Sequence, residues 1–201
     1  MISVIENARE RSQYSNMLTD LALKSGLDAV GVSSAEPFTD VRIELERRRS
    51  AGLHAEMQFT FRNPERSTTP TRILEGAKSL IVGALRTNSP NLPEAGPGKM
   101  KIGAYARCDY YSILRSALNV VAEQLLEDGW KSRVVADDNS LVDRAAAVRA
   151  GIGWYGKNGN VLIPGRGSWF VLGSVVTNAP LSVDTPISKT FIDFSHNGIS
   201  D

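Results

Sequence analysis

Residues 134–173 read VVADDNSLVDRAAAVRAGIGWYGKNGNVLIPGRGSWFVLG, and this stretch decides how the chain is built. It joins a β-branched strand that ends in two aspartates, a short alanine-rich helix, a turn of glycines, aromatics and a lysine, and a second apolar strand. Glycine lets the backbone approach other groups closely, and loops held between buried elements commonly carry binding sites. The stretch therefore predicts a surface where a large, flat ligand can lie against the main chain.

Two adjacent aspartates, Asp137 and Asp138, follow the first of these strands. The carboxyl end of a strand is the edge where α/β proteins commonly bind ligands. Neighbouring side chains point in different directions, so we expect at most one of the two to face a site. A second interpretation stays open here: the two acids complete a turn and complement a helix dipole, an effect worth about 1 kcal/mol or less.

The helix after the aspartates has sequence signals for its start and its end. Ser140 is typical of an N-cap, Asp143 stands at the capping-box position, and Gly151 is typical of a helix stop. The following GIGWYG matches the dinucleotide fingerprint, but that motif must follow a strand and open a helix. Here it follows a helix, so we predict no dinucleotide site. This turn and the later PGRGS turn either bind amides or phosphates through exposed N–H groups or are plain hairpin corners.

The bulk composition excludes several classes of protein. With 201 residues, 42% hydrophobic content and a net charge of +1, the chain suits one globular core and shows no bulk charge for binding polyanions. Its single cysteine, Cys108, allows no internal disulfide and cannot alone hold zinc or an iron–sulfur cluster. The start lacks the apolar core of a signal peptide, and no run is long enough to span a membrane. We therefore expect a cytoplasmic protein without membrane contact.

Signals along the rest of the chain alternate between helix and strand, which favours the α/β (α+β) class with a central mixed sheet flanked by helices. We expect helices at 14–24, 41–52 and 110–129, and strands at 29–33, 79–85, 101–106, 133–136 and 169–177. Residues 88–98 are predicted as a loop. Residues 59–72 are also predicted as a loop, which is either a surface crossing or a set of arginines and aromatics that grip an anionic ligand. We therefore expect one domain over residues 1–181 and an irregular tail over residues 182–201.

Four segments together resemble a known family. They are DAVGVSSAEPF (28–38), RSTTPTRILEGAKSLIVGAL (66–85), YARCDYYSILR (105–115) and the stretch from Asp137 to Gly173, which contains AGIGWYGKN and GSWFVLG. Over roughly residues 15–181 the chain resembles the N-terminal, cobalamin-binding domain of epoxyqueuosine reductases, the oxidoreductases that finish queuosine in tRNA. The resemblance implies a nitroreductase-like cobalamin-binding fold and reduction of an epoxide to an alkene on the anticodon region of tRNA, with cob(II)alamin as the bound cofactor.

The resemblance also implies roles for individual residues. The family's proton donor is an aspartate seven residues before an arginine, which corresponds to Asp137 before Arg144. Asp137 would then need apolar surroundings that raise its pKa. The residues implied to contact cobalamin are Arg66, Gly103, Asp137, Val161 and Leu172. No metal-ligating residue is implied in this chain.

The chain departs from the family pattern in two respects. Family members carry two [4Fe–4S] clusters on cysteine motifs that do not occur here, so the resemblance implies a separate ferredoxin-like iron–sulfur protein as electron donor for what would be a truncated enzyme. The family's Asp-Tyr-His reads Tyr110-Tyr111-Ser112, which leaves the substrate open. Two alternatives to an epoxyqueuosine reductase therefore stand: a cobalamin-binding module without catalysis, and a related flavin or corrinoid reductase with another substrate.

Overall fold

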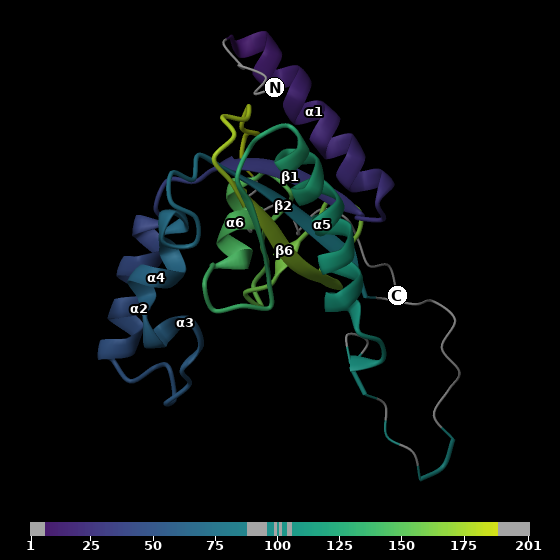
Figure 1. Ribbon diagram of the computed structural model, residues 1–201. Coiled ribbons are helices and arrows are strands. Elements are labelled where there is room, and N and C mark those ends of the chain that lie inside the picture. The colour runs from purple at the N-terminus through teal and green to yellow at the C-terminus, as the bar shows by residue number, and fades with distance from the viewer. Residues whose placement is uncertain (1–6, 88–95, 99, 101, 104–105, 189–201) are drawn as a thin grey trace.

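A four-stranded sheet organises the molecule (Figure 1). The computed structural model describes residues 7–87, 96–98, 100, 102–103 and 106–188. Across the sheet the strands are β1 (Ala29–Ser34), β2 (Ser79–Arg86), β6 (Phe170–Thr177) and β3 (Ser132–Ala136). A second sheet pairs β4 (Trp154–Tyr155) with β5 (Val161–Leu162). These two short strands belong to the glycine-rich stretch and lie next to the site described below.

The expected α/β class and the flanking helices are confirmed, but the description of the sheet as mixed is corrected. All pairings within the four-stranded sheet are antiparallel among the residues that the structure describes. Apolar periodicity reports which faces of a strand are buried and carries no information on the direction of its neighbour. The strand expected at 101–106 is not found either. Of its residues the structure describes Ile102, Gly103 and Ala106, and none of them lies in a strand.

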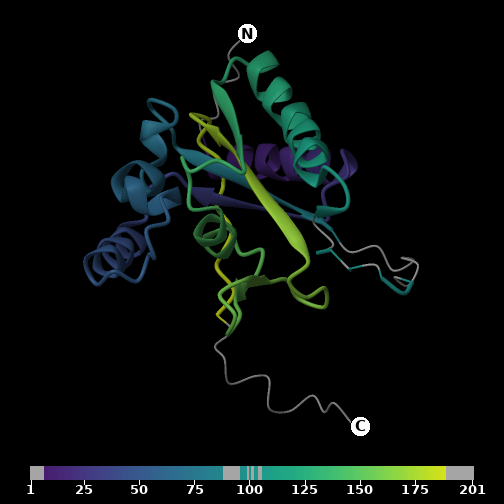
Figure 2. The same cartoon turned by 90° about the horizontal axis from the view of Figure 1, so that it is seen from below.

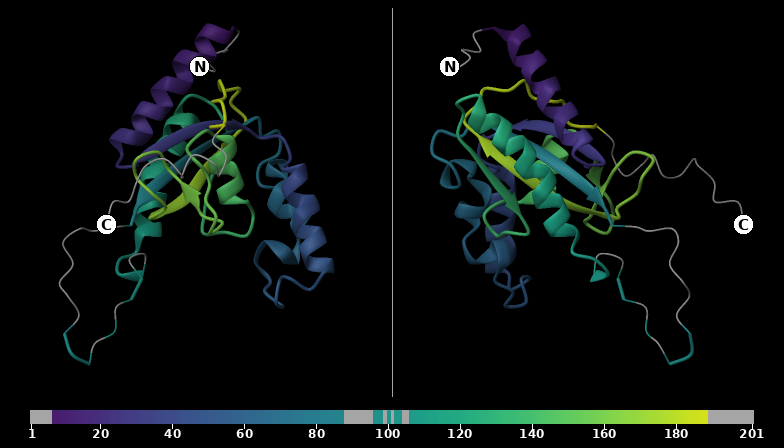
Figure 3. Two further views of the ribbon diagram at one scale, coloured as in Figure 1. Left: turned by 180° about the vertical axis from the view of Figure 1, so that it is seen from behind. Right: turned by 45° about the vertical axis from the view of Figure 1, so that its right-hand side comes forward.

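Helices cover both faces of the sheet. Helices α1 (Ala8–Lys24) and α5 (Tyr110–Glu127) lie on one face, and α6 (Asp143–Arg149) lies on the other (Figure 2, Figure 3). In β2, Ile81 packs into the core beneath α1 and α5, whereas Leu80 and Val82 pack into the core around α6. Successive side chains of a strand alternate between faces, so the unbroken apolar run of β2 is what a strand covered on both sides requires.

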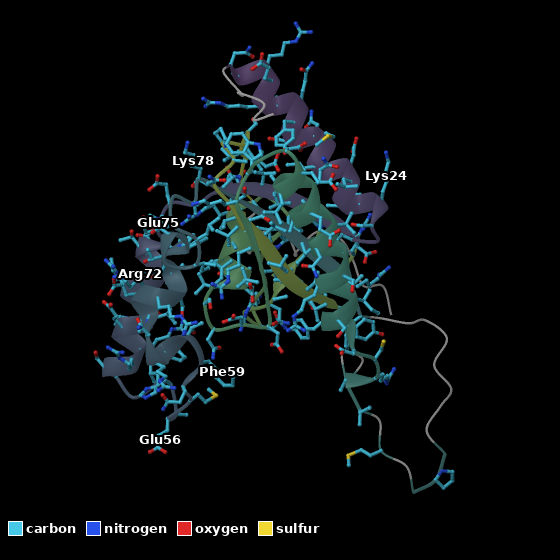
Figure 4. All side chains as sticks on the ribbon, in the orientation of Figure 1. Lys24, Glu56, Phe59, Arg72, Glu75 and Lys78 are labelled. Atoms are coloured by element: carbon cyan, nitrogen blue, oxygen red, sulfur yellow. The ribbon has the colours of Figure 1, made fainter. Side chains whose placement is uncertain are left out.

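A helical arm, residues 39–72, stands beside the sheet (Figure 1). It comprises α2 (Thr39–Ser50), α3 (Phe59–Arg62), α4 (Pro64–Thr68) and the 3₁₀ turn η1 (Pro70–Arg72). The loop expected at 59–72 is therefore wrong. The Asn63 side chain accepts a hydrogen bond from the Arg66 N–H and Pro64 occupies the first turn, two ordinary signals of a helix start. Figure 4 shows Glu56 and Phe59 at the far end of this arm from the sheet.

Residues 182–188 have no regular secondary structure but are attached to the sheet. The Asp184 carboxylate accepts a hydrogen bond from the Val32 N–H, and the Asp184 N–H donates to the Val32 carbonyl, both at 2.8 Å. The segment thereby covers part of the free edge of β1. Residues 88–95 and 189–201 lie outside the described residues, so the domain boundary at 181 stays a prediction. No described helix has the length and apolar character to cross a membrane.

Candidate functional site

Of the cavities that lie along α6, two meet at the start of the helix. The larger, about 760 Å³, is bounded by the helical arm, the segment between β3 and α6, and the turn between β4 and β5. The smaller, about 280 Å³, is bounded by α5, the start of α6, and strands β5 and β6. Asp143 and Arg144 line both cavities. The start of α6 is therefore a shared wall between the two.

Asp137 begins the acidic loop, which we define as residues 137–142 between β3 and α6. Its φ is 54°, a left-handed conformation that is uncommon outside glycine and that aspartate and asparagine tolerate better than other residues. Asp137 lines the larger cavity and is exposed. The apolar surroundings that the acid role of Asp137 would need are not found in this structure, because the loop holds the exposed carboxyl at an open cavity wall.

Asp138 has a different environment from its neighbour. Its Oδ1 accepts hydrogen bonds from the Ser140 hydroxyl at 2.6 Å and from the Ser140 N–H at 2.8 Å. These bonds, chiefly the hydroxyl bond, hold the pKa of Asp138 below its usual range. Ser140 is therefore not the N-cap that its position suggests; that place belongs to Val142, which makes no side-chain cap bond. The serine stabilises the turn, and Asp138 stays ionised.

Helix α4 of the arm is hydrogen-bonded to the acidic loop. The Arg66 guanidinium donates to the Ser140 hydroxyl at 3.0 Å, and the buried Ser67 hydroxyl donates to the Asn139 carbonyl at 2.6 Å. Both bonds join residues more than 70 positions apart in sequence. Arg66 itself is not among the residues that line either cavity. Its place in the structure is that of a support for the loop.

We expect Ser67→Ala to lower the free energy of unfolding by about 1–2 kcal/mol, because the Asn139 carbonyl then loses its donor. Urea unfolding of the two proteins measures this difference. Ser116→Ala is the matched control, since the exposed Ser116 hydroxyl bonds only within its own helix, to Ser112; we expect it to change stability by no more than about 0.5 kcal/mol. Equal losses in both variants would show that the link from the arm to the loop contributes nothing specific.

The other residues singled out in the sequence fall at different distances from the cavities. Val161 on β5 and Leu172 on β6 both line the smaller cavity. Gly103 lies before α5 and lines neither; its carbonyl accepts a hydrogen bond from the Ala106 N–H. The structure thus places Asp137, Val161 and Leu172 around the same wall at the start of α6. It leaves Gly103 apart from that wall.

Asp143 stands at the capping-box position in the sequence, but its environment in the structure is not that of a capping residue. Its Oδ1 is closed off from solvent and finds no hydrogen-bond partner among the residues that the structure describes, although the residue as a whole is partly exposed. Burial raises the pKa of Asp143 to about 8, with a further contribution from the negative charges of Asp137 and Asp138 and an opposing one from Arg144. The sequence shows an acid at a helix start, which normally accepts cap bonds. Its burial has no local sequence signal.

The glycine motif GIGWYG is not a nucleotide loop. It follows α6 and leads into the short strand β4, as predicted, rather than opening a helix. A Cβ at Gly153 would overlap the Leu162 carbonyl, so this glycine allows the β4–β5 pair to close. In the described part of the chain, no group of three or more His, Cys, Asp or Glu side chains is arranged to hold a metal ion.

Proteins of known structure share the fold of this chain. No protein-family model matches the chain. A catabolic reductive dehalogenase superposes with a TM-score of 0.61 at 19% identity, over 90% of this chain and 21% of that one, which shows a shared fold. The epoxyqueuosine reductase of Bacillus subtilis, solved with its catalytic aspartate loop swung out of the active site, superposes with a TM-score of 0.76 at 28% identity over 89% of this chain and 48% of that one.

Two further comparisons show similarity to epoxyqueuosine reductases in sequence and in structure. The epoxyqueuosine reductase of Bacillus anthracis is 35% identical over 170 residues, 81% of this chain and 44% of that protein. An epoxyqueuosine reductase solved with an epoxyqueuosine-modified tRNA stem loop superposes with a TM-score of 0.73 at 28% identity, over 87% of this chain and 48% of that one. The chain is therefore similar to epoxyqueuosine reductases along most of its own length, and the resemblance inferred from its motifs is confirmed. It spans about half the length of the curated relatives that it matches.

Proposed function

We propose that the chain is the cobalamin-binding catalytic part of a tRNA epoxyqueuosine reductase. The observation that carries this proposal is the wall at the start of α6, where Asp137 and Asp143 face cavities inside the region of similarity. A relative bound to an epoxyqueuosine-modified tRNA stem loop supports tRNA as the substrate. We accordingly place the protein in the cytoplasm, where tRNA is modified.

The reaction fixes what the site must supply. Reduction of an epoxide to an alkene consumes two electrons and two protons, breaks both C–O bonds and releases the oxygen as water. Bound cobalamin supplies a reduced cobalt centre for the carbon, and the protein supplies orientation and protons. The single cysteine of these 201 residues cannot ligate two clusters, so we propose that an iron–sulfur protein or another low-potential one-electron donor outside these residues provides the electrons.

The residues at the smaller cavity suit the edge of a corrin, whose whole ring is larger than this cavity of about 280 Å³. A corrin is a broad, largely apolar ring fringed with amides, and it suits apolar walls beside bare backbone. Val161 and Leu172 supply the apolar wall. Gly165 and Gly167 have φ values of 66° and 75° and open space where a Cβ would lie, so these two positions of the turn beside Ser168 offer bare backbone. Gly103, also implied by resemblance, would contact the ring from the segment before α5.

In this arrangement each polar residue has a separate task. Asp137, at the wall of the larger cavity, protonates the epoxide oxygen as the ring opens. The Arg144 guanidinium donates to the Gly159 carbonyl at 2.8 Å and so ties the start of α6 to the turn between β4 and β5. Arg66 holds the acidic loop through Ser140. The aspartate-bearing catalytic loop of the Bacillus subtilis enzyme supports the assignment of Asp137.

A spectroscopic titration tests cofactor binding. We expect the protein to change the visible spectrum of cob(II)alamin in a saturable way, and Leu172→Arg to weaken binding at least tenfold because the charged side chain enters the smaller cavity. Leu126→Arg is the control, since Leu126 is 57% exposed on α5 and lines neither cavity. A spectrum that stays unchanged, or a parallel titration in which the protein binds flavin instead, would contradict the proposal and favour a related flavin reductase.

Loss of epoxide from an epoxyqueuosine-modified tRNA stem loop tests catalysis. The assay contains the protein, cobalamin and a strong chemical reductant in place of the iron–sulfur donor. We expect alkene to accumulate with repeated turnover. Tight cobalamin binding without any product would identify the chain as a binding module without catalysis.

A further inference from the structure

Asp143 lies at the junction of the two cavities with an unsatisfied carboxyl oxygen. Its Oδ1 is shut off from solvent and has no hydrogen-bond partner in the described part of the chain, while its residue lines both cavities. An unpartnered buried polar atom is destabilising, and native proteins contain few of them. Such an atom at a cavity wall indicates a group kept for its chemistry rather than for the fold.

A capping role does not account for Asp143. An acid at the start of a helix usually accepts bonds from the free backbone N–H groups and is stabilised as an anion there. The N-cap residue of α6 is Val142, and no side-chain cap bond is formed. The carboxyl of Asp138 accepts bonds from Ser140 instead, and these close a turn within the acidic loop without capping α6.

Charged and titratable groups from every neighbouring element surround the two cavities that Asp143 lines. They are Asp137, Asp138 and Arg144 beside it, Glu44 and Arg48 from α2, Tyr111 from α5, and Tyr155 and Lys157 from β4 and the turn after it. Burial is the main reason that the pKa of Asp143 rises to about 8, and the two acids of the loop add to it. The raised pKa of Asp143 favours its protonated form near neutral pH, whereas the lowered pKa of Asp138 favours the anion.

The overall reaction needs two protons, and Asp137 can carry only one of them at a time. We propose that Asp143 holds the second proton and delivers it at the cavity junction to the oxygen that leaves as water. This inference rests on the proposed function. The oxygen freed from carbon is far more basic than a carboxylate, so the transfer is downhill. The O–H bond of Asp143 breaks, an O–H bond of water forms, and the Asp143 carboxylate regains a proton from solvent through the larger cavity.

The first test needs neither cofactor nor substrate. Wild type and Asp143→Asn are unfolded in urea between pH 5 and pH 8.5. Above pH 4 the unfolded chain ionises Asp143 while the folded chain keeps it protonated, so the folded state binds more protons and wild-type stability falls as pH rises toward 8. We expect the variant to gain stability relative to wild type over this range. A difference that does not vary with pH overturns the proposal.

Asp138→Asn is the matched control for that measurement. The folded pKa of Asp138 is lowered, so its stabilising effect is present above the unfolded pKa and is lost only as pH falls toward strongly acidic values. We therefore expect the difference between wild type and Asp138→Asn to vary much less with pH from pH 5 to pH 8.5, by no more than the part that the Asp138 charge adds to the raised pKa of Asp143. The two variants make the same change of side chain at nearby positions, but the pKa of Asp143 is raised by burial and that of Asp138 is lowered by its bonds from Ser140.

The second test measures turnover. With cobalamin, a chemical reductant and epoxyqueuosine-modified stem loop, we expect Asp143→Asn to bind cobalamin normally but to turn over at least 100-fold more slowly at pH 7. Asp143→Glu should recover a substantial part of the rate, and the wild-type rate should fall above about pH 8. Normal turnover by Asp143→Asn overturns the role of Asp143. Inactive wild type overturns the proposed function instead, and leaves the stability result standing.

Discussion

Asp137→Asn is expected to lower turnover by at least 100-fold while cobalamin binding stays intact. Asparagine has the shape of aspartate but no acidic proton, and removal of a general acid typically costs a factor of 10² to about 10⁴ in rate. The substitution also suits the backbone. Asp137 has a φ of 54°, and asparagine is the residue that shares the tolerance of aspartate for this conformation. The acidic loop should therefore keep its structure.

The measurement pairs two readouts on one variant. Epoxide loss from the modified stem loop gives the rate, and the visible spectrum of cobalamin gives binding. Asp20→Asn is the control because Asp20 is exposed on α1, on the opposite face of the sheet from α6, and loses the same charge. Wild-type turnover in Asp137→Asn would remove Asp137 from the chemistry. A joint loss of binding and rate would make Asp137 a structural residue.

Gly31→Ala is expected to lower the free energy of unfolding by about 2–3 kcal/mol, more than Ser67→Ala or Gly83→Ala. Gly31 lies in β1 opposite Val82, and a Cβ there would overlap the backbone carbonyl of Ala150 at the end of α6. A backbone carbonyl cannot rotate aside as a side chain can. Helix α6 would have to move away from the sheet, and Asp143 and Arg144 would move with it.

Gly83→Ala separates backbone overlap from ordinary crowding. A Cβ at Gly83 would meet the Leu27 Cδ1 at 2.6 Å and the Leu118 Cδ2 at 3.2 Å, both of which are ends of flexible side chains. We expect this variant to lose less than about 1 kcal/mol. The midpoint of urea unfolding, with an unchanged slope, measures both losses. Equal losses would show that the contact between Gly31 and α6 is not a special constraint on the fold.

Helices and strands with a regular local pattern of apolar residues could be predicted from the sequence. The periodicity of α1 and α5 and the apolar runs of β1, β2 and β6 predicted these five elements within two residues of their observed bounds, except that α1 begins six residues earlier than predicted, at Ala8. Long ordered motifs such as AGIGWYGKN carried the similarity to epoxyqueuosine reductases. Both results depend on neighbouring residues alone. A local pattern is therefore enough to obtain them.

The direction of the strands and the environments of Asp137, Asp138 and Asp143 could be read only from the tertiary structure. The helices at 59–72 carry a weak local signal, yet their function as a support depends on bonds from Arg66 and Ser67 to a loop more than 70 residues away. Asp143 appears in the sequence as a capping acid; its closed Oδ1 results from packing between α6 and the elements around it. Burial and charge proximity act through space, and they set which carboxyl keeps a proton.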